Sequence, residues 1–205
     1  MADNLIFLPE GSLGRPSDAV ESFCWITSAK LSFDVLWNTD GTDDAINLYH
    51  AAEYEGEVNN GGHDQYFHNR NNHTPVYRSA LKGLEMIGAD AYARLVAAMI
   101  TWAEQHPEEV AATPDTPRSS TLDRLDDQFF SLSKERSVRD FTRDWLSRSP
   151  KVRLIPKAEF ERMGLDAQKA RSARSDAVAQ APQTETAVLR GFARRLIDRL
   201  THWKL

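Results

Sequence analysis

The segment from Glu57 to Asn69 carries the densest set of side chains that could do chemistry. Two asparagines and two glycines, residues 59–62, separate its carboxylate from an amide and an aromatic pair. Because asparagine and glycine tolerate positive φ, this run predicts that a helix ends there and the chain turns sharply. The helix macrodipole disfavours a glutamate in the last turn. We therefore expect Glu57 to accept hydrogen bonds from loop N–H groups or from Gln65, in a structural corner between two helices.

The same region offers a second interpretation, as a metal site or an enzyme active site. His50, Glu53 and Glu57 repeat at helical spacing, and further histidines follow at positions 63, 68 and 73. A metal site needs three or four converging ligands with a second shell, and a helical di-iron site needs Glu-x-x-His pairs on partner helices. No such pair occurs in the sequence, so we expect no metal and no cofactor. An enzyme or metal-binding protein that uses Glu57–Asn69 stays the alternative.

Other catalytic signals are weak. Cys24 is the one cysteine and lies among Phe23, Trp25 and Ile26, which predicts a buried core thiol rather than a nucleophile. The pair of glycines at 61–62 lacks the lysine and the flanking strand of a phosphate-binding loop. A single cysteine also excludes an internal disulfide and favours a reducing compartment, so we expect a cytoplasmic protein. The short apolar start has no basic flank and predicts no signal peptide.

The elements that position these residues are expected to be helices. Apolar residues recur at helical spacing from a Ser17 N-cap to the turn that begins at Asn38, and again from Thr42 to the glycine pair. Later helices are expected to start at Pro75 and Asp90 and to cover 121–133 and 137–147. No long run alternates apolar and polar residues, although residues 152–155 could form a short strand or an extended arm. The fold class is predicted to be all-α, with about six helices.

Composition divides the chain into four parts. We expect an N-terminal arm over residues 1–16, an acidic helical domain over 17–147, an extended arm and flexible linker over 148–185, and a basic amphipathic helix over 186–205. The linker interpretation depends on residues 166–186, which are rich in Ala, Gln, Ser and Arg and contain no aromatic residue. The last helix is defined by one apolar stripe. That stripe consists of Leu189, Phe192, Leu196, Leu200 and Trp203.

Charge is divided as unevenly as composition. Residues 1–145 contain 24 acids and 12 bases, whereas residues 146–205 contain 6 acids and 13 bases. Such a split indicates two different partners, or a tail that folds back on the acidic part. The apolar stripe of the tail could pack on the domain, on a partner, on a second copy in a homodimer, or, less favoured, on a membrane surface.

The motifs together resemble the DNA-mimic protein C-terminal domain family of bacterial proteins. The corner motif of that family is matched by Glu57, Asn60, Gly61, Gly62, Gln65, Tyr66, Phe67 and Asn69. The resemblance continues through an Ala-Leu and Ile-Gly-Ala helix (80–89) and a Leu-Asp-x-x-Phe helix (125–129), so that it covers residues 45–147. His63 stands where the family usually has Phe, which makes an apolar position titratable and able to face solvent.

The resemblance implies an α-helical domain whose acidic surface imitates duplex DNA and binds a DNA-binding protein. We therefore predict a non-enzymatic, regulatory protein-binding function, without direct nucleic-acid binding. Duplex DNA presents about one charge per 1.7 Å, so a 30 Å face would need roughly 18 negative charges, and this chain can imitate only a short stretch. The acids expected to form the partner-binding face are Asp43, Asp44, Glu53, Glu55, Asp123, Asp126 and Asp127.

Overall fold

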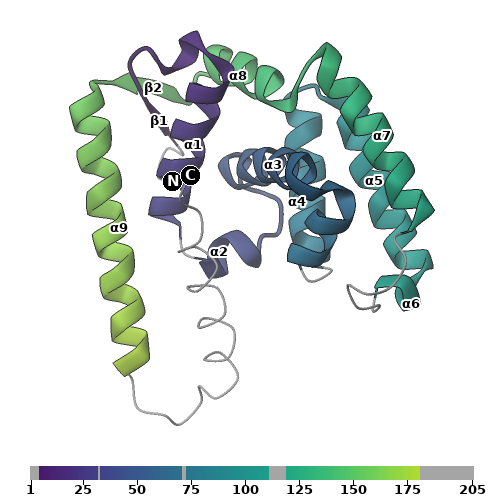
Figure 1. The fold of residues 1–205 in the computed structure, drawn as a ribbon. Coiled ribbons are helices and arrows are strands. Elements are labelled where there is room, and N and C mark those ends of the chain that lie inside the picture. The colour runs from purple at the N-terminus through teal and green to yellow at the C-terminus, as the bar shows by residue number, and fades with distance from the viewer. Residues whose placement is uncertain (1–4, 32, 71–72, 111–118, 181–205) are drawn as a thin grey trace. The chain divides into compact units, whose positions relative to one another are not determined.

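The computed structural model describes residues 5–31, 33–70, 73–110 and 119–180, and these are mostly helical, as predicted (Figure 1). The chain forms two compact units, Met1–Gln168 and Lys169–Leu205. Helix α9 (Lys157–Gln180) continues from the first unit into the second. The amphipathic helix expected over 186–205 lies outside the described residues. No helix in the described ranges has the length and apolar character needed to cross a membrane.

The first predicted helix is two helices, α1 (Pro16–Lys30) and α2 (Phe33–Trp37). The predicted Ser17 N-cap is wrong, because Arg15 is the extended cap residue and Pro16 occupies the first turn. A residue that precedes proline favours the extended conformation, and proline fits the first helical position, so this pair starts the helix earlier. At the other end, Leu31 is extended and separates α1 from α2.

Helix α3 (Asp44–Asn69) contains the predicted corner but does not end there. Asp43 caps it by accepting from the backbone N–H groups of Ala45 and Ile46. Gly61 and Gly62 leave helical geometry, and the helix then resumes through Asn69. Only Gly62 has positive φ, at 77° with ψ −176°, a conformation essentially restricted to glycine. The expected helix end at residues 59–62 is therefore a break inside α3, because the buried side chains of Tyr66 and Phe67 hold a second helical segment against the bundle.

The following helices match the sequence prediction closely. Pro75 lies in the first turn of α4 (Thr74–Met86), and α5 (Asp90–Gln105) starts at the expected aspartate. The short α6 (Pro107–Val110) precedes α7 (Ser120–Glu135) and α8 (Val138–Arg148). Ser137 and Asp140 form a reciprocal capping box at the start of α8. The sequence was sufficient to predict these helices because their capping residues and the spacing of their apolar residues lie within each helical segment.

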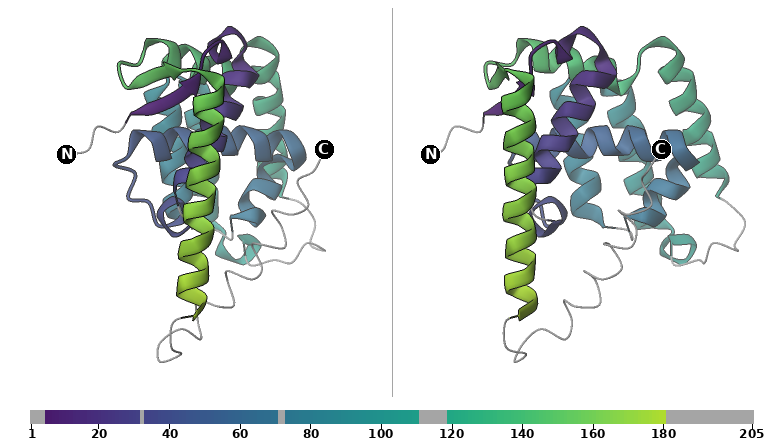
Figure 2. Two further views of the ribbon diagram at one scale, coloured as in Figure 1. Left: turned by 90° about the vertical axis from the view of Figure 1, so that its left-hand side faces the viewer. Right: turned by 60° about the vertical axis from the view of Figure 1, so that its left-hand side comes forward.

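Helix α3 lies at the centre of the first unit, where it contacts α1, α4, α7 and α8. The turned views show it running across the neighbouring helices (Figure 2). Its Tyr54 ring meets Phe129 of α7 edge-on, with ring centres 5.6 Å apart, and Tyr92 of α5 meets the same Phe129 at 5.4 Å. Full burial of a side chain such as Phe129 stabilises the fold by about 2–3 kcal/mol. This aromatic core fixes α3, α5 and α7 relative to one another.

The N-terminal arm is part of this core rather than a separate segment. Strand β1 (Ile6–Pro9) pairs in parallel with β2 (Val152–Ile155), with Ile6 opposite Val152. Leu8 is fully buried and Ile6 nearly so. The strand alternative for 152–155 is therefore confirmed, and the compact unit extends beyond the expected limits of 17 and 147 on both sides. The sequence could not show this pairing, because its two strands are separated by almost the whole unit.

The linker predicted for residues 148–185 is wrong over most of its length. After β2 the chain forms α9, and Phe160 of that helix packs on Trp25 of α1 with ring centres 5.2 Å apart. Gly164 lies against the same Trp25 ring. The segment is rich in Ala, Arg, Lys and Gln, which are good helix formers. Because polar residues occur on every side of this helix, it lacks the apolar stripe by which a helix is normally detected.

Candidate functional site

Glu57 is the centre of the corner motif. Its Oε2 accepts hydrogen bonds from Gln65 Nε2 at 3.0 Å and from Asn69 Nδ2 at 2.7 Å. Its Oε1 is 3.4 Å from the Arg70 guanidinium. The hydrogen bond expected from Gln65 is thus present. Both oxygens of Glu57 are used to hold the second segment of α3 against the first.

Arg70 occupies the position that the metal interpretation would give to a cation. Its guanidinium contacts Glu53 as well as Glu57, and all three side chains are largely covered. Burial alone would lower the pKa of Arg70, but the carboxylates of Glu53 and Glu57 outweigh burial and hold that pKa above its ordinary value. An internal ion-pair network therefore uses the two carboxylates that the sequence offered as metal ligands.

His50, the third of those ligands, points to a different partner. Its Nε2 donates to the Leu36 carbonyl at 2.7 Å, and His73 Nε2 donates to the neighbouring Trp37 carbonyl at 2.8 Å. These carbonyls lie in the last turn of α2, where a helix leaves its C=O groups without internal partners. Burial lowers the pKa of His50 to about 4. The two histidines therefore fix the end of α2.

A buried chain of three polar side chains connects the corner to α7. Asp126 Oδ1 accepts from the His63 backbone N–H at 2.7 Å and from His63 Nδ1 at 2.6 Å. The other ring nitrogen, Nε2, is 2.9 Å from the Tyr54 hydroxyl. Since an ionised carboxylate only accepts, His63 Nδ1 carries a proton, and in this neutral tautomer Nε2 accepts from the Tyr54 hydroxyl. Asp126 thus caps the second segment of α3 from another helix.

This Asp–His–Tyr chain has the order of an acid–base triad, but solvent does not reach it. His63 and Tyr54 are fully buried, so the expectation that His63 could face solvent is wrong. Burial, together with the nearby Tyr66, Tyr92 and Asp126, raises the pKa of Tyr54 well above its ordinary value. The hydroxyl therefore stays protonated, and the chain serves as a hydrogen-bonded link rather than an exposed nucleophile.

Glu55 forms a second buried link between helices. Its side chain is 2% exposed, pairs with the Arg139 guanidinium at 3.4 Å, and accepts from the Arg139 backbone N–H at 3.3 Å. Burial raises the pKa of Glu55, and the Arg139 charge opposes that rise. Because Arg139 lies in the first turn of α8, Glu55 stabilises the start of that helix from α3.

The predicted acidic face is therefore largely dispersed. Glu55 and Asp126 are buried, so their assignment to that face is wrong, for the reason that each completes a link between helices. Asp43 caps α3, and Asp44 pairs with Lys151 at 2.6 Å. Glu53 is engaged with Arg70, as described above. Of the expected acids, Asp123 and Asp127, both on α7, are exposed residues, and the paired side chain of Asp44 is itself 41% exposed.

Other surface features are small. Among the described residues, a hollow of about 100 Å³ between α4 and α5 is lined by Tyr77 and Ile100, among others, and one of about 270 Å³ at the end of α8 is lined by Trp145 and Lys151, among others. Both lie below the roughly 300–1,000 Å³ of a typical ligand pocket. His106, Glu108 and Glu109 bring one ligand atom each within 4.8 Å of one another. In this cluster His106 Nδ1 lies 3.6 Å from a carboxylate oxygen of Glu108 and 3.4 Å from one of Glu109, and both glutamates are exposed.

The buried acids left a signal that the sequence prediction did not use. Asp126 falls at the same helical spacing as Leu122, Leu125 and Phe129, so it stands inside the apolar stripe of α7. Glu55 likewise falls between the buried Ala51 and Val58 on α3. A carboxylate within an apolar stripe is a candidate for a buried, paired group rather than for a surface charge.

Comparison with known proteins gives one family. The family model described as DMP19-like protein matches residues 40–149, which include the corner, the Asp126–His63–Tyr54 chain and α7. Neither the curated proteins nor the solved structures contain a significant match.

Proposed function

Because this chain belongs to the DMP19-like protein family, we propose that it is a non-enzymatic regulatory protein that binds a DNA-binding protein through an acidic surface. The family match carries the proposal, since it covers residues 40–149 and more than half of the chain. The acidic surface is assigned to the outer side of α7, where Asp123 and Asp127 are exposed. Asp64 adds a third exposed carboxylate close by, because it follows His63, which is bound to Asp126 of α7.

The internal geometry supports a binding role for the corner motif as a scaffold. Glu57, Arg70 and Asp126 bond to other side chains of the same unit and hold α7 and the two segments of α3 in fixed positions. A surface that imitates another molecule must keep its charges in place, since interface charges act through their arrangement. Rigid support beneath α7 meets that requirement.

Competition with duplex DNA tests the proposal. Purified bacterial DNA-binding proteins, including histone-like proteins and helix-turn-helix repressors, are incubated with labelled duplex and increasing amounts of this protein. We expect at least one of them to release its DNA, and the complex to weaken steeply with salt, because exposed carboxylates act through a field screened over about 10 Å at 0.1 M salt.

Charge variants on α7 provide the matched comparison. Asp123→Asn combined with Asp127→Asn should weaken the displacement of DNA, whereas Glu159→Gln on α9 should leave it unchanged. Displacement that is indifferent to salt up to near-molar concentration, or no displacement from any DNA-binding protein, would contradict the proposed function.

A further inference from the structure

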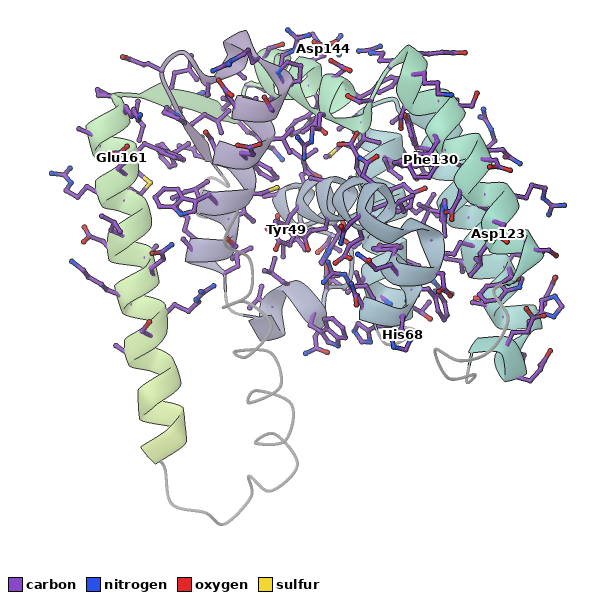
Figure 3. The ribbon with its side chains drawn as sticks, viewed as in Figure 1. Tyr49, His68, Asp123, Phe130, Asp144 and Glu161 are labelled. Atoms are coloured by element: carbon purple, nitrogen blue, oxygen red, sulfur yellow. The ribbon has the colours of Figure 1, made fainter. Side chains whose placement is uncertain are left out.

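The outer face of α7 combines charge with an exposed aromatic ring. Asp123, Asp127 and Phe130 are spaced four and three residues apart, so they share one side of the helix over about 10 Å. Figure 3 labels Asp123 and Phe130 on α7, and both residues are exposed. Lys134, four residues after Phe130, lies on the same side, and Arg124 is exposed next to Asp123, so the charge of this side is mixed rather than uniformly negative.

Phe130 is the unusual member of this face. Its side chain is 40% exposed, although the preceding Phe129 is fully buried and meets it edge-on with ring centres 5.5 Å apart. The core therefore does not need both rings, since Phe129 already fills the space between Tyr54 and Tyr92. Aromatic residues, Phe included, are enriched in the cores of protein interfaces, where a few of them act as anchors.

We propose that the α7 face formed by Asp123, Asp127 and Phe130 is a docking surface for a basic protein that presents an apolar recess beside its cationic side chains. This inference rests on the proposed function and narrows it. The carboxylates select a cationic partner by charge complementarity. Phe130 adds a requirement that a duplex backbone does not impose, because phosphates and sugars offer no projecting aromatic ring. Recognition here is therefore not by imitation of DNA charge alone.

Two synthetic peptides of equal length and lysine content test the inference. One is filled with serine, and in the other leucine replaces half of the serines. Their binding to the full chain is measured by NMR titration of the backbone amides. We expect both peptides to shift the NMR signals of the α7 amides. The leucine peptide should bind about tenfold more tightly than the serine peptide, a difference of the size that one interface anchor typically contributes.

Variants distinguish the contribution of the Phe130 ring to peptide binding from that of the two carboxylates. Phe130→Ala should reduce the preference for the leucine peptide to near unity, with an unchanged melting temperature as the check on folding. Leu165→Ala, which removes an apolar side chain that is 51% exposed on α9, should keep the preference. Asp123→Asn combined with Asp127→Asn should weaken both peptides equally.

The outcomes distinguish the two proposals. If both peptides bind with equal affinity, or if Phe130→Ala keeps the leucine preference, the aromatic anchor is wrong while binding to a basic partner stands. Shifts confined to surfaces away from α7 also overturn the docking surface. If neither peptide binds, both this inference and the proposed acidic binding function fail.

Discussion

Asp126 and Glu55 show how single carboxylates inside the bundle hold helices that are distant in the sequence. Each lies on an apolar stripe, and each accepts a backbone N–H from the first turn of another helical segment. Burial of a carboxylate is unfavourable unless such hydrogen bonds and a charged partner compensate it. The two residues therefore contribute to the fold and not to the outer surface.

Removal of the Asp126 carboxylate should destabilise the protein strongly. Asp126→Ala leaves the His63 backbone N–H and Nδ1–H without their acceptor, which should lower the free energy of unfolding by about 2–4 kcal/mol. The neighbouring Asp127→Ala, on the exposed side of the same helix, should change it by no more than about 0.5 kcal/mol. Urea denaturation measures both. Equal effects of the two variants would show that the buried link contributes nothing.

His50 makes stability depend on pH. Its pKa is about 4 in the folded protein, below the ordinary 6.5, so the unfolded chain takes up the proton first as pH falls. The contribution of His50 to the free energy of unfolding is fully present above pH 6.5. It decreases by roughly 3 kcal/mol as the pH falls from 6.5 to about 4. His50→Gln keeps a donor for the Leu36 carbonyl and should remove this part of the decline. His68→Gln, at an exposed histidine, should follow the wild-type profile of unfolding free energy against pH, and parallel profiles for all three proteins would refute the assignment.

At the scale of elements, the break in α3 lets the two segments of one helix pack against different neighbouring helices. The first segment places Tyr54 and Glu55 in the core, and the second places Tyr66 and Phe67 against α4 and α5 through Tyr77 and Trp102. Glu57 and Arg70 connect the two segments across the break. The corner thus acts as a rigid joint, fixed on one side by its own side chains and on the other by Asp126.

A Cβ atom should destabilise the protein at the glycine of the break that has positive φ, and stabilise it at a glycine in the regular part of the same helix. Gly62→Ala forces a side chain into a backbone conformation with φ 77° and should cost about 1–3 kcal/mol. Gly56→Ala lies in the regular part of α3, where a Cβ meets nothing within 4 Å, and should stabilise the protein by about 0.5–1 kcal/mol. Chemical denaturation gives both values. A Gly62→Ala protein as stable as wild type would mean that the break relaxes without strain.

At the scale of the whole molecule, the first unit is closed by strands from its two ends. Parallel pairing of β1 with β2 brings Ile6 and Leu8 into the core beside α1. Segments that look like appendages in the sequence therefore complete the unit.

Leu8 tests this closure. Leu8→Ala removes a fully buried side chain and should lower the free energy of unfolding by about 2–5 kcal/mol. Leu154→Ala, on the partner strand but 48% exposed, should have a much smaller effect. Thermal and urea unfolding measure the difference, and a Leu8→Ala protein that unfolds like Leu154→Ala would place β1 outside the cooperative unit.

The sequence by itself determined the features that neighbouring residues encode. The starts of α4, α5 and α8 and the turn at Gly61–Gly62 all follow from residues within a few positions of each other. Only the tertiary structure decided which carboxylates are exposed, since it brings together His63 and Asp126, which are 63 residues apart in the sequence. The same holds for β1 and β2, and for α9, whose Phe160 becomes a core residue through contact with Trp25. Caps and turns depend on interactions between residues that are neighbours in the sequence. Burial and ion pairing depend on residues that are distant in the sequence and that only the fold brings into contact.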